Sequence, residues 1–156
     1  MKITDLIEPE RVFVGMRASS KTQLLRGLAQ QASKFIGMSE RTVLDALNAR
    51  EQLGSTGVGE GIAIPHARID GLSNFFALFT RLDRPIDFIA IDEQPVDLIF
   101  LLLSPAGATT DHLAALACVS RRLRDRELAQ RLRATKQPAQ LYEELTKGEI
   151  GESPRT

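Results

Sequence analysis

The chain has 156 residues, the size of one ordinary domain, and is long enough to bury a hydrophobic core. Its 20 basic side chains balance its 20 acidic ones, which excludes a net charge that would attract nucleic acid or an anionic membrane. The single cysteine, Cys118, excludes an internal disulfide framework and fits a reducing compartment.

The start of the chain and its longest apolar run indicate a cytoplasmic protein. The first ten residues, MKITDLIEPE, carry charges and a proline where a signal peptide would carry an apolar segment. The longest apolar run, Leu98–Leu103, is far shorter than the ~20 residues of a membrane-spanning helix, so no membrane insertion is expected. We therefore expect one domain over residues 1–148, followed by a frayed polar tail over residues 149–156.

The first third of the chain predicts one strand and two helices. The apolar run Val12–Met16 is typical of a strand. Ser20 is a predicted N-cap for a helix with apolar residues at helical spacing, and Gly37 is its predicted C-terminal stop. A second helix is expected to begin at Ser39 and to end before Gly54.

Residues 54–68 read GSTGVGEGIAIPHAR and are the most informative stretch of the sequence. Four glycines permit positive φ angles and close backbone approach, so that successive N–H groups can turn toward one anion. The run Ile62–Ile64 predicts a short buried strand, which places His66 at the end of that strand, beside the loop. Arg50 lies in the last turn of the preceding helix, close to the same loop. The candidate phosphate-binding residues of the loop are Ser55, Thr56, Gly57, Gly59 and Gly61.

The rest of the chain predicts three further strands and three helices around two turns. Val96–Leu103 is the most hydrophobic stretch and is the predicted central strand. The other expected elements are a strand over Phe75–Leu82, a turn over Asp83–Pro85, a short strand over Ile86–Ile91, a turn over Asp92–Pro95, a loop over Ser104–Thr110, and helices over Asp111–Arg124, Asp125–Thr135 and Pro138–Lys147. This order predicts an α/β protein, a three-layer α/β/α sandwich with a mixed β-sheet flanked by helices.

Only two histidines are present, and both are candidates for the chemistry of a site. His112 follows a predicted strand end, where α/β folds place their ligands, so the two imidazoles can meet across one cleft. The alternative, an exposed residue at a helix start, stays open. No metal or cofactor is expected, because the histidines and Cys118 lack the clustered spacing of a zinc site.

The motifs of other phosphate-handling and hydrolytic enzymes are absent. The glycine-rich stretch lacks the Lys-Ser/Thr of a P-loop, and its glycines do not follow the dinucleotide-binding spacing. No G-x-S-x-G elbow presents a serine nucleophile. His66 is therefore the better nucleophile, since a neutral imidazole can attack phosphorus and form a labile phosphoramidate.

Six arginines crowd residues 121–133 and have two interpretations. Asp125 and Glu127 interrupt the run, which is typical of a solvated helix face. The alternative is a docking patch for an acidic partner, and the sequence does not decide between them.

Several motifs, in a fixed order over about residues 4–146, resemble the fructose/mannitol-type IIA domains of the bacterial phosphoenolpyruvate-dependent phosphotransferase system. The matching motifs are Arg50-Glu51, residues 54–57 (GSTG), residues 61–66 (GIAIPH), residues 92–96 (DEQPV), residues 105–107 (PAG) and residues 111–113 (DHL). The resemblance implies that His66 is phosphorylated on Nε2. It also implies that Arg50 is the phosphate-site arginine and His112 the second active-site histidine.

Within this family the chain resembles the nitrogen-regulatory branch. The opening ITDLIEPERVFV, the pair Ala67-Arg68 and the lack of attached IIB or IIC portions favour that branch. The resemblance implies a phosphocarrier that accepts a phosphoryl group from a phosphohistidine carrier protein of the NPr or HPr type. It further implies regulation of targets such as potassium-transport or sensor components. Two alternatives are a sugar-specific IIA component that passes phosphate to a separate IIB protein, and a non-catalytic interaction module.

Overall fold

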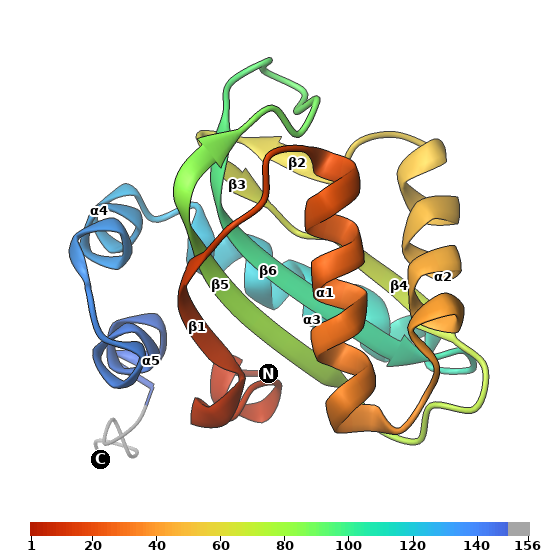
Figure 1. The fold of residues 1–156 in the computed structure, drawn as a ribbon. Helices are drawn as coiled ribbons and strands as arrows, with labels where there is room; N and C mark the ends of the chain where they lie inside the picture. The colour runs from red at the N-terminus through yellow and green to blue at the C-terminus, as the bar shows by residue number, and fades with distance from the viewer. Residues whose placement is uncertain (150–156) are drawn as a thin grey trace, which may run out of the picture.

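The computed structural model describes residues 1–149, which form a mixed sheet of six strands and five α-helices (Figure 1). The strands are β1 (Val12–Met16), β2 (Gly57–Gly59), β3 (Ile62–Ala63), β4 (His66–Ile69), β5 (Phe76–Ile86) and β6 (Val96–Pro105). The helices are α1 (Lys21–Ile36), α2 (Glu40–Gln52), α3 (Thr109–Leu123), α4 (Arg126–Ala134) and α5 (Pro138–Thr146). Short 3₁₀ turns at Ile3–Asp5 and Pro9–Arg11 precede β1.

The central strand is β6, as its hydrophobicity predicts. The sheet order is β1-β5-β6-β3-β2, and β4 also pairs with β6. β6 runs antiparallel to β5 and parallel to β3 and β4, while β1 runs parallel to β5 and β2 antiparallel to β3. The mixed sheet is thereby confirmed. Because β3 and β4 lie along the same side of β6, the chain from Ile62 to Ile69 behaves as one strand interrupted near Pro65.

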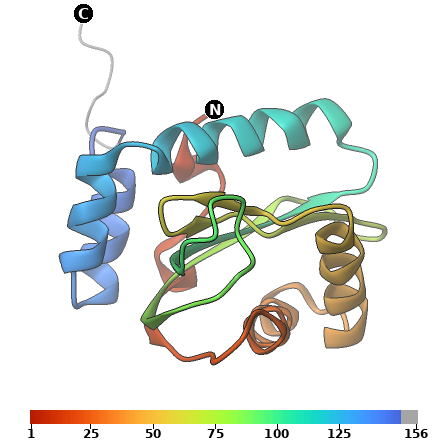
Figure 2. The same cartoon turned by 90° about the horizontal axis from the view of Figure 1, so that it is seen from above.

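Both faces of β6 are buried, so the protein has the three layers that the element order predicts. Alternate residues of β6 pack against the helices on opposite faces, with Leu98, Phe100 and Leu102 toward α3, α4 and α5. Ile99, Leu101 and Leu103 face α1 and α2. Figure 2 shows the sheet between these two layers, with α1 and α2 on one side and α3 on the other.

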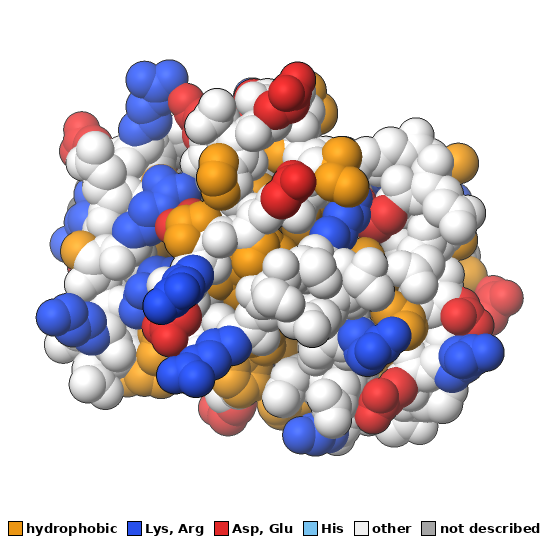
Figure 3. Space-filling view, turned by 45° about the horizontal axis from the view of Figure 1, so that its top comes forward, with side chains coloured by type: hydrophobic (Ala, Val, Ile, Leu, Met, Phe, Trp, Pro, Cys, Tyr) orange, Lys and Arg blue, Asp and Glu red, His pale blue; other side chains and the backbone are white. Residues whose placement is uncertain are grey.

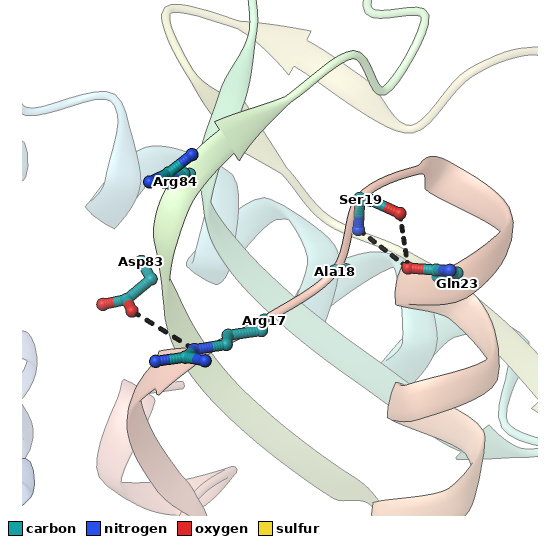
Figure 4. A pocket seen from close by; sticks show the side chains of 6 residues that line it. All are labelled: Arg17, Ala18, Ser19, Gln23, Asp83 and Arg84. Carbon is teal, nitrogen blue, oxygen red and sulfur yellow. Dashed lines mark hydrogen bonds and ion pairs between the residues drawn. The ribbon is translucent and has the colours of Figure 1, made fainter.

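The N-terminal ends of α1 and α2 are capped by the predicted serines. Ser20 Oγ accepts a hydrogen bond from the N–H of Gln23 at 3.1 Å, and Ser39 Oγ accepts one from Thr42 at 3.1 Å. The side chain of Gln23 folds back and accepts hydrogen bonds from the N–H and Oγ of Ser19 (Figure 4). Gly37 ends α1 at φ 71°, which glycine adopts without steric cost. Among the described helices, none combines the length and the apolar content needed to cross a membrane.

The segment after Leu82 differs from the prediction. Asp83–Pro85 was expected to turn, but β5 continues through these residues to Ile86, with a shift in its register against β6 after Arg81. Pro85 is tolerated there because a strand irregularity needs no ladder N–H at every residue. The strand predicted over Ile86–Ile91 is also wrong, since β5 ends at Ile86 and residues 87–95 form a loop.

Two other predicted boundaries differ from those in the structure. The loop predicted over Ser104–Thr110 is shorter, because β6 continues to Pro105 and α3 begins at Thr109, ahead of Asp111. Glu149, the first residue of the predicted frayed tail, is held in place, because its carboxylate accepts hydrogen bonds from the N–H groups of Ile3 and Thr4, at 3.0 and 3.1 Å. The remainder of that predicted tail, residues 150–156, lies outside the described residues.

Candidate functional site

A cleft of about 690 Å³ opens beside β4, between α2 and α3. Among the described strands β4 pairs only with β6, so its outer edge is open toward this cleft. The lining side chains come from three places in the sequence: Arg50 and Leu53 from α2 and its end, His66 and Arg68 from β4, and Thr109, His112 and Leu113 from α3. The structure thus brings together Arg50, His66 and His112, which the sequence analysis singled out.

His66 is the first residue of β4, so its predicted place at the end of a strand is wrong. The interruption at Pro65 explains the difference, because the histidine begins the second half of a broken strand. His66 Nδ1 lies 2.7 Å from the carbonyl oxygen of Ile64. A carbonyl can only accept, so Nδ1 carries the proton and Nε2 keeps its lone pair.

Arg50 fixes the other side of the imidazole. Its Nε–H donates to His66 Nε2 at 3.1 Å, and its NH1 group donates to the carbonyl oxygen of Gly54 at 2.9 Å. The guanidinium is therefore held between the histidine and the loop that follows α2. Burial lowers the pKa of His66, the hydrogen bond to Ile64 opposes this, and the Arg50 charge lowers the pKa further. The ring is therefore neutral at pH 7.

His112 lies in the first turn of α3 and is only 8% exposed, so the interpretation as an exposed helix-start residue is wrong. Its ring centroid is 5.5 Å from that of His66. His112 Nδ1 lies 2.6 Å from the buried hydroxyl of Ser104, at the end of β6. A serine hydroxyl can donate or accept in this contact; in the tautomer in which it donates to Nδ1, the proton of His112 is on Nε2 and that nitrogen is a donor. Burial, followed by the charges of His66 and Arg68, lowers the pKa of His112 to about 4.

Two neighbours of the imidazoles were missed from the sequence. Arg68 follows His66 by two residues on β4, and strand residues two apart share one face of the sheet. Its NH1 group donates to Thr109 Oγ1 at 2.9 Å, so it reaches across the cleft to α3. Side chains two residues apart on a strand point the same way, and this spacing from His66 could have identified Arg68 from the sequence. Ser104 carried no such signal, because its contact with His112 exists only in the folded chain.

The glycine-rich loop lies apart from the lining of the cleft. Ser55, Thr56, Gly57, Gly59 and Gly61 are not among the lining residues. The N–H of Thr56 donates to the Glu51 carboxylate at 3.0 Å, and the N–H of Gly57 donates to Ser55 Oγ at 3.0 Å. The N–H of Thr56 is thus engaged by α2 and that of Gly57 within the loop. The phosphate contacts expected of this loop stay a prediction.

The loop is held by a partly buried ion pair beneath it. Lys21 Nζ lies 2.9 Å from a carboxylate oxygen of Glu51, and the Glu51 side chain is 7% exposed. The same carboxylate accepts hydrogen bonds from the backbone N–H and the hydroxyl of Thr56. Since Arg50 precedes Glu51 and binds Gly54, this network fixes the segment that carries the guanidinium. Arg50 therefore lines the cleft, while Glu51 stabilises the segment that carries Arg50.

Tight packing gives a physical reason for two of the glycines. A Cβ atom at Gly57 would lie 2.8 Å from the Cβ of Ala90, and one at Gly61 would collide with the guanidinium of Arg133. The positive φ of Gly61, 82°, further favours glycine there. Close approach of Ala90 therefore explains the glycine at position 57, and the positive φ explains the glycine at position 61.

Replacement of Gly57 with alanine is expected to lower the free energy of unfolding by about 1–3 kcal/mol, the usual cost of overpacking. The added methyl would displace Phe88 and Ala90, which it would contact. Denaturant unfolding of the variant and of Gly27→Ala measures the effect, since a Cβ at Gly27 has no neighbour within 4 Å. Equal stability of Gly57→Ala and the wild-type protein would contradict the packing explanation.

Both imidazoles are expected to titrate below their ordinary pKa of 6.5, and the pKa of His112 is lowered to about 4. The unfolded chain takes up protons near pH 6.5 while the folded protein does not. The two histidines therefore make the folded state less stable as the pH falls from 6.5 toward 4. An NMR titration of the ring Cε1–H signals, assigned with His112→Gln, measures both values. A midpoint at or above 6.5 for either ring would contradict the burial argument.

The fold and the cleft define an α/β protein whose candidate site is a neutral imidazole flanked by arginine donors. In residues 1–149, His, Cys, Asp and Glu side chains form no group of three that could hold a metal ion. The chain belongs to the family described as phosphoenolpyruvate-dependent sugar phosphotransferase system, EIIA 2, which matches residues 5–148. The family resemblance of the motifs is confirmed by this match.

Similar proteins carry a nitrogen-regulatory description. The nitrogen regulatory protein of Bradyrhizobium diazoefficiens is 50% identical over 145 residues, which cover 93% of this chain and 95% of that protein. The nitrogen regulatory protein of Klebsiella oxytoca is 39% identical and covers 94% of this chain and 91% of its own length. The crystal structure of nitrogen regulatory protein IIA-Ntr from Neisseria meningitidis matches with a TM-score of 0.87 and 32% identity, over 92% of this chain and 99% of that one. These likenesses agree with the branch that the sequence predicts.

Proposed function

We propose that the protein is a phosphocarrier of the nitrogen-branch phosphotransferase system and that His66 accepts the phosphoryl group. The observation that carries the proposal is the hydrogen bonding of this imidazole, which leaves Nε2 unprotonated. Its Nδ1–H is fixed on the Ile64 carbonyl, and its Nε2 lone pair lies beside Arg50. The donor is a phosphohistidine on a carrier protein of the NPr or HPr type, and the reaction belongs in the cytoplasm.

The transfer needs no metal or nucleotide in this proposal. The Nε2 lone pair of His66 attacks phosphorus while the N–P bond of the donor breaks, and its electron pair returns to the donor imidazole. The Nδ1 proton stays on the ring throughout, and the Ile64 carbonyl stabilises the positive charge that the phosphorylated ring acquires.

Three donors surround the position that the phosphoryl oxygens would occupy. Arg50 supplies Nε–H next to Nε2, His112 supplies its own Nε2–H, and Arg68 borders the same cleft. Fixed donors that meet charge developing on transferring oxygens lower the barrier without reorganisation. In this proposal the glycine-rich loop acts through Gly54, whose carbonyl anchors Arg50.

Apolar side chains on both walls of the cleft give the carrier a surface for docking. Leu53 is 84% exposed at the end of α2, and Leu113 is 63% exposed on α3. Exposed leucines beside a polar centre are typical of protein–protein contact sites. We assign the surface that surrounds His66, including Leu53 and Leu113, to docking of the carrier protein.

Phosphorylation also gives the protein a means of regulation. A phosphoryl group adds a charge of about −1.5 to −2 at one point of a balanced protein. An apolar or acidic partner surface that seats over Leu53 and Leu113 is disfavoured by this charge. We therefore propose targets that bind the free form and leave the phosphorylated one, potassium-transport or sensor components being the kind that the family resemblance implies.

The function is tested by incubating the protein with phosphoenolpyruvate and the upstream carriers of the nitrogen or the sugar branch, followed by intact mass measurement. The proposal requires a gain of one phosphoryl group, and faster labelling through the nitrogen-branch carriers. Faster labelling through the sugar carriers, with onward transfer to a IIB protein, would favour a sugar-specific component. Lack of labelling by both would favour an interaction module.

His112 is expected to tolerate glutamine better than alanine. The amide of His112→Gln keeps an N–H donor in the cleft, whereas His112→Ala removes it and leaves the Ser104 hydroxyl without its partner. Transfer by the alanine variant should fall by about 10²–10³, the usual effect of losing one oriented donor, and the glutamine variant should fall less. Single-turnover labelling from the phosphorylated carrier measures both rates. A wild-type rate for His112→Ala would remove this residue from the site.

A further inference from the structure

The loop of residues 87–95 presents two isoleucines that no described element covers. It projects beyond the sheet between β5 and β6 (Figure 1). Ile89 is 68% exposed and Ile91 is 75% exposed, whereas Phe88 and Ala90, which alternate with them in the sequence, are buried. The alternation directs one pair of side chains into the core and the other into solvent. One short loop thus exposes two large apolar side chains, and clustered exposed apolar groups mark interaction sites more often than single ones do.

The backbone of this loop is strained at one of the isoleucines. Ile89 has φ 57°, in the left-handed region that β-branched residues rarely adopt. The carboxylate of Asp87 holds it there by accepting the N–H of Ile89 at 2.9 Å. Asn or Gly would adopt this conformation more easily, and an exposed isoleucine gains nothing from packing in return. Strain of this kind clusters at functional sites, so it points to a use for this position.

The loop is anchored along its length, so its isoleucines are held in place before any contact forms. The N–H of Ile91 donates to the carbonyl of Gly57 at 3.2 Å, and Ser55 Oγ donates to the carbonyl of Phe88 at 3.3 Å. Asp92 accepts from the N–H of Glu60 at 2.9 Å. A pre-ordered apolar pair loses little conformational entropy when a partner covers it.

The charge of the loop is of one sign. Residues 86–95 read IDFIAIDEQP and contain Asp87, Asp92 and Glu93 but no lysine or arginine, in a chain whose charges balance. In Figure 3 acidic side chains (red) stand beside apolar ones (orange) at the top of the molecule, where the loop lies. Val58 on β2 is also 44% exposed and lies next to Gly57, which binds the loop.

From these observations we infer that residues 87–95 are a docking loop for a second protein, one that offers an apolar groove bordered by lysine or arginine. The isoleucines fill the groove, and the acidic residues beside them meet its basic border. This surface is separate from the cleft, because neither isoleucine lines it. Occupation of the loop therefore does not require the phosphoryl-accepting site, and the inference goes beyond the proposed function.

The partner is identified by photo-crosslinking in living cells of the organism that encodes the protein. A benzoylphenylalanine is placed at Ile91 in the full chain, and at Phe35 in a matched control, since Phe35 is 44% exposed on α1. We expect one protein crosslinked from Ile91 and not from Phe35, at a peptide that combines apolar and basic residues. Crosslinks to a second copy of this chain, to lipid, or to the same proteins as the control would overturn the inference.

The identified protein is then purified and its binding measured with variants. Ile91→Asp and Glu93→Lys should each weaken binding at least about tenfold while phosphoryl acceptance stays unchanged. Added salt should weaken the wild-type interaction, because basic and acidic groups meet at its rim. Ile89→Asn should raise the midpoint of thermal unfolding and lower the affinity, since asparagine relieves the strain and removes the apolar contact. Wild-type affinity in Ile91→Asp would overturn the assignment.

Discussion

His66→Ala is expected to gain no phosphoryl group under conditions in which the wild-type protein gains one. The residue supplies an imidazole lone pair that is fixed beside an arginine, because Nδ1–H is bound to Ile64 and Nε2 faces Arg50. In the tautomer proposed for His112, Nε2 carries the proton and has no lone pair to offer, so this residue cannot substitute for His66. Intact mass measurement after incubation with phosphoenolpyruvate and the carriers gives the result directly.

The chemistry of the bond supplies an independent check. A phosphoramidate on imidazole is lost in acid and survives alkali, so the label on the wild-type protein should behave in this way. Thermal unfolding of His66→Ala must show a folded protein, because the absence of label in an unfolded variant means nothing. Label that survives hot acid would place the phosphoryl group on a hydroxyl such as that of Ser55 and would contradict the proposed site.

Elements defined by local chemistry were predicted well from the sequence. Ser20, Gly37 and Ser39 mark helix ends through contacts within a few residues, so their patterns are complete in the sequence. The central strand follows from a run that is apolar on both faces, and its burial against two helical layers confirms that interpretation. The cluster of Arg50, His66 and His112 was also found, because the family motif carries all three in order.

Features that depend on contacts between distant segments could not be predicted in this way. The sequence shows that residue 57 is a glycine, but the Ala90 side chain that excludes a Cβ there lies 33 positions later. Ile86–Ile91 has the apolar content of a strand, yet Ile89 takes a left-handed conformation that only the folded loop imposes. A pattern of residue types does not specify which segments meet.

The arginines of residues 121–133 illustrate the same limit. Arg126 pairs with Glu60, Arg131 with Glu144 and Arg133 with Asp97, at 2.7, 2.8 and 2.9 Å. Basic side chains gather on the α4 side of the surface in Figure 3 with acidic ones between them. These pairs favour a structural use of the cluster over a docking patch. The three acidic partners come from three different segments, so the sequence alone could not distinguish the two interpretations.

Arg50→Lys is expected to slow phosphoryl transfer by about 10²–10³, the effect of removing one oriented donor from a developing charge. The wild-type guanidinium donates in two directions at once, from Nε to His66 Nε2 and from NH1 to the Gly54 carbonyl. A lysine carries its charge on one ammonium group. This group lacks the planar fork of the guanidinium and is too compact to span the two acceptors. It keeps the charge, so the comparison isolates geometry from electrostatics.

Arg41→Lys on the same helix is the matched control, because Arg41 is 84% exposed and pairs only weakly with Asp45 at 3.7 Å. It should transfer at the wild-type rate. Both variants should unfold within about 1 kcal/mol of the wild-type protein, since neither side chain fills the core. Rates are compared under single-turnover conditions over a range of carrier concentrations, which separates docking from chemistry. A slow step at saturating carrier places Arg50 at the transferring phosphoryl group. A wild-type rate for Arg50→Lys would show that the contact with His66 only orders the unphosphorylated ring.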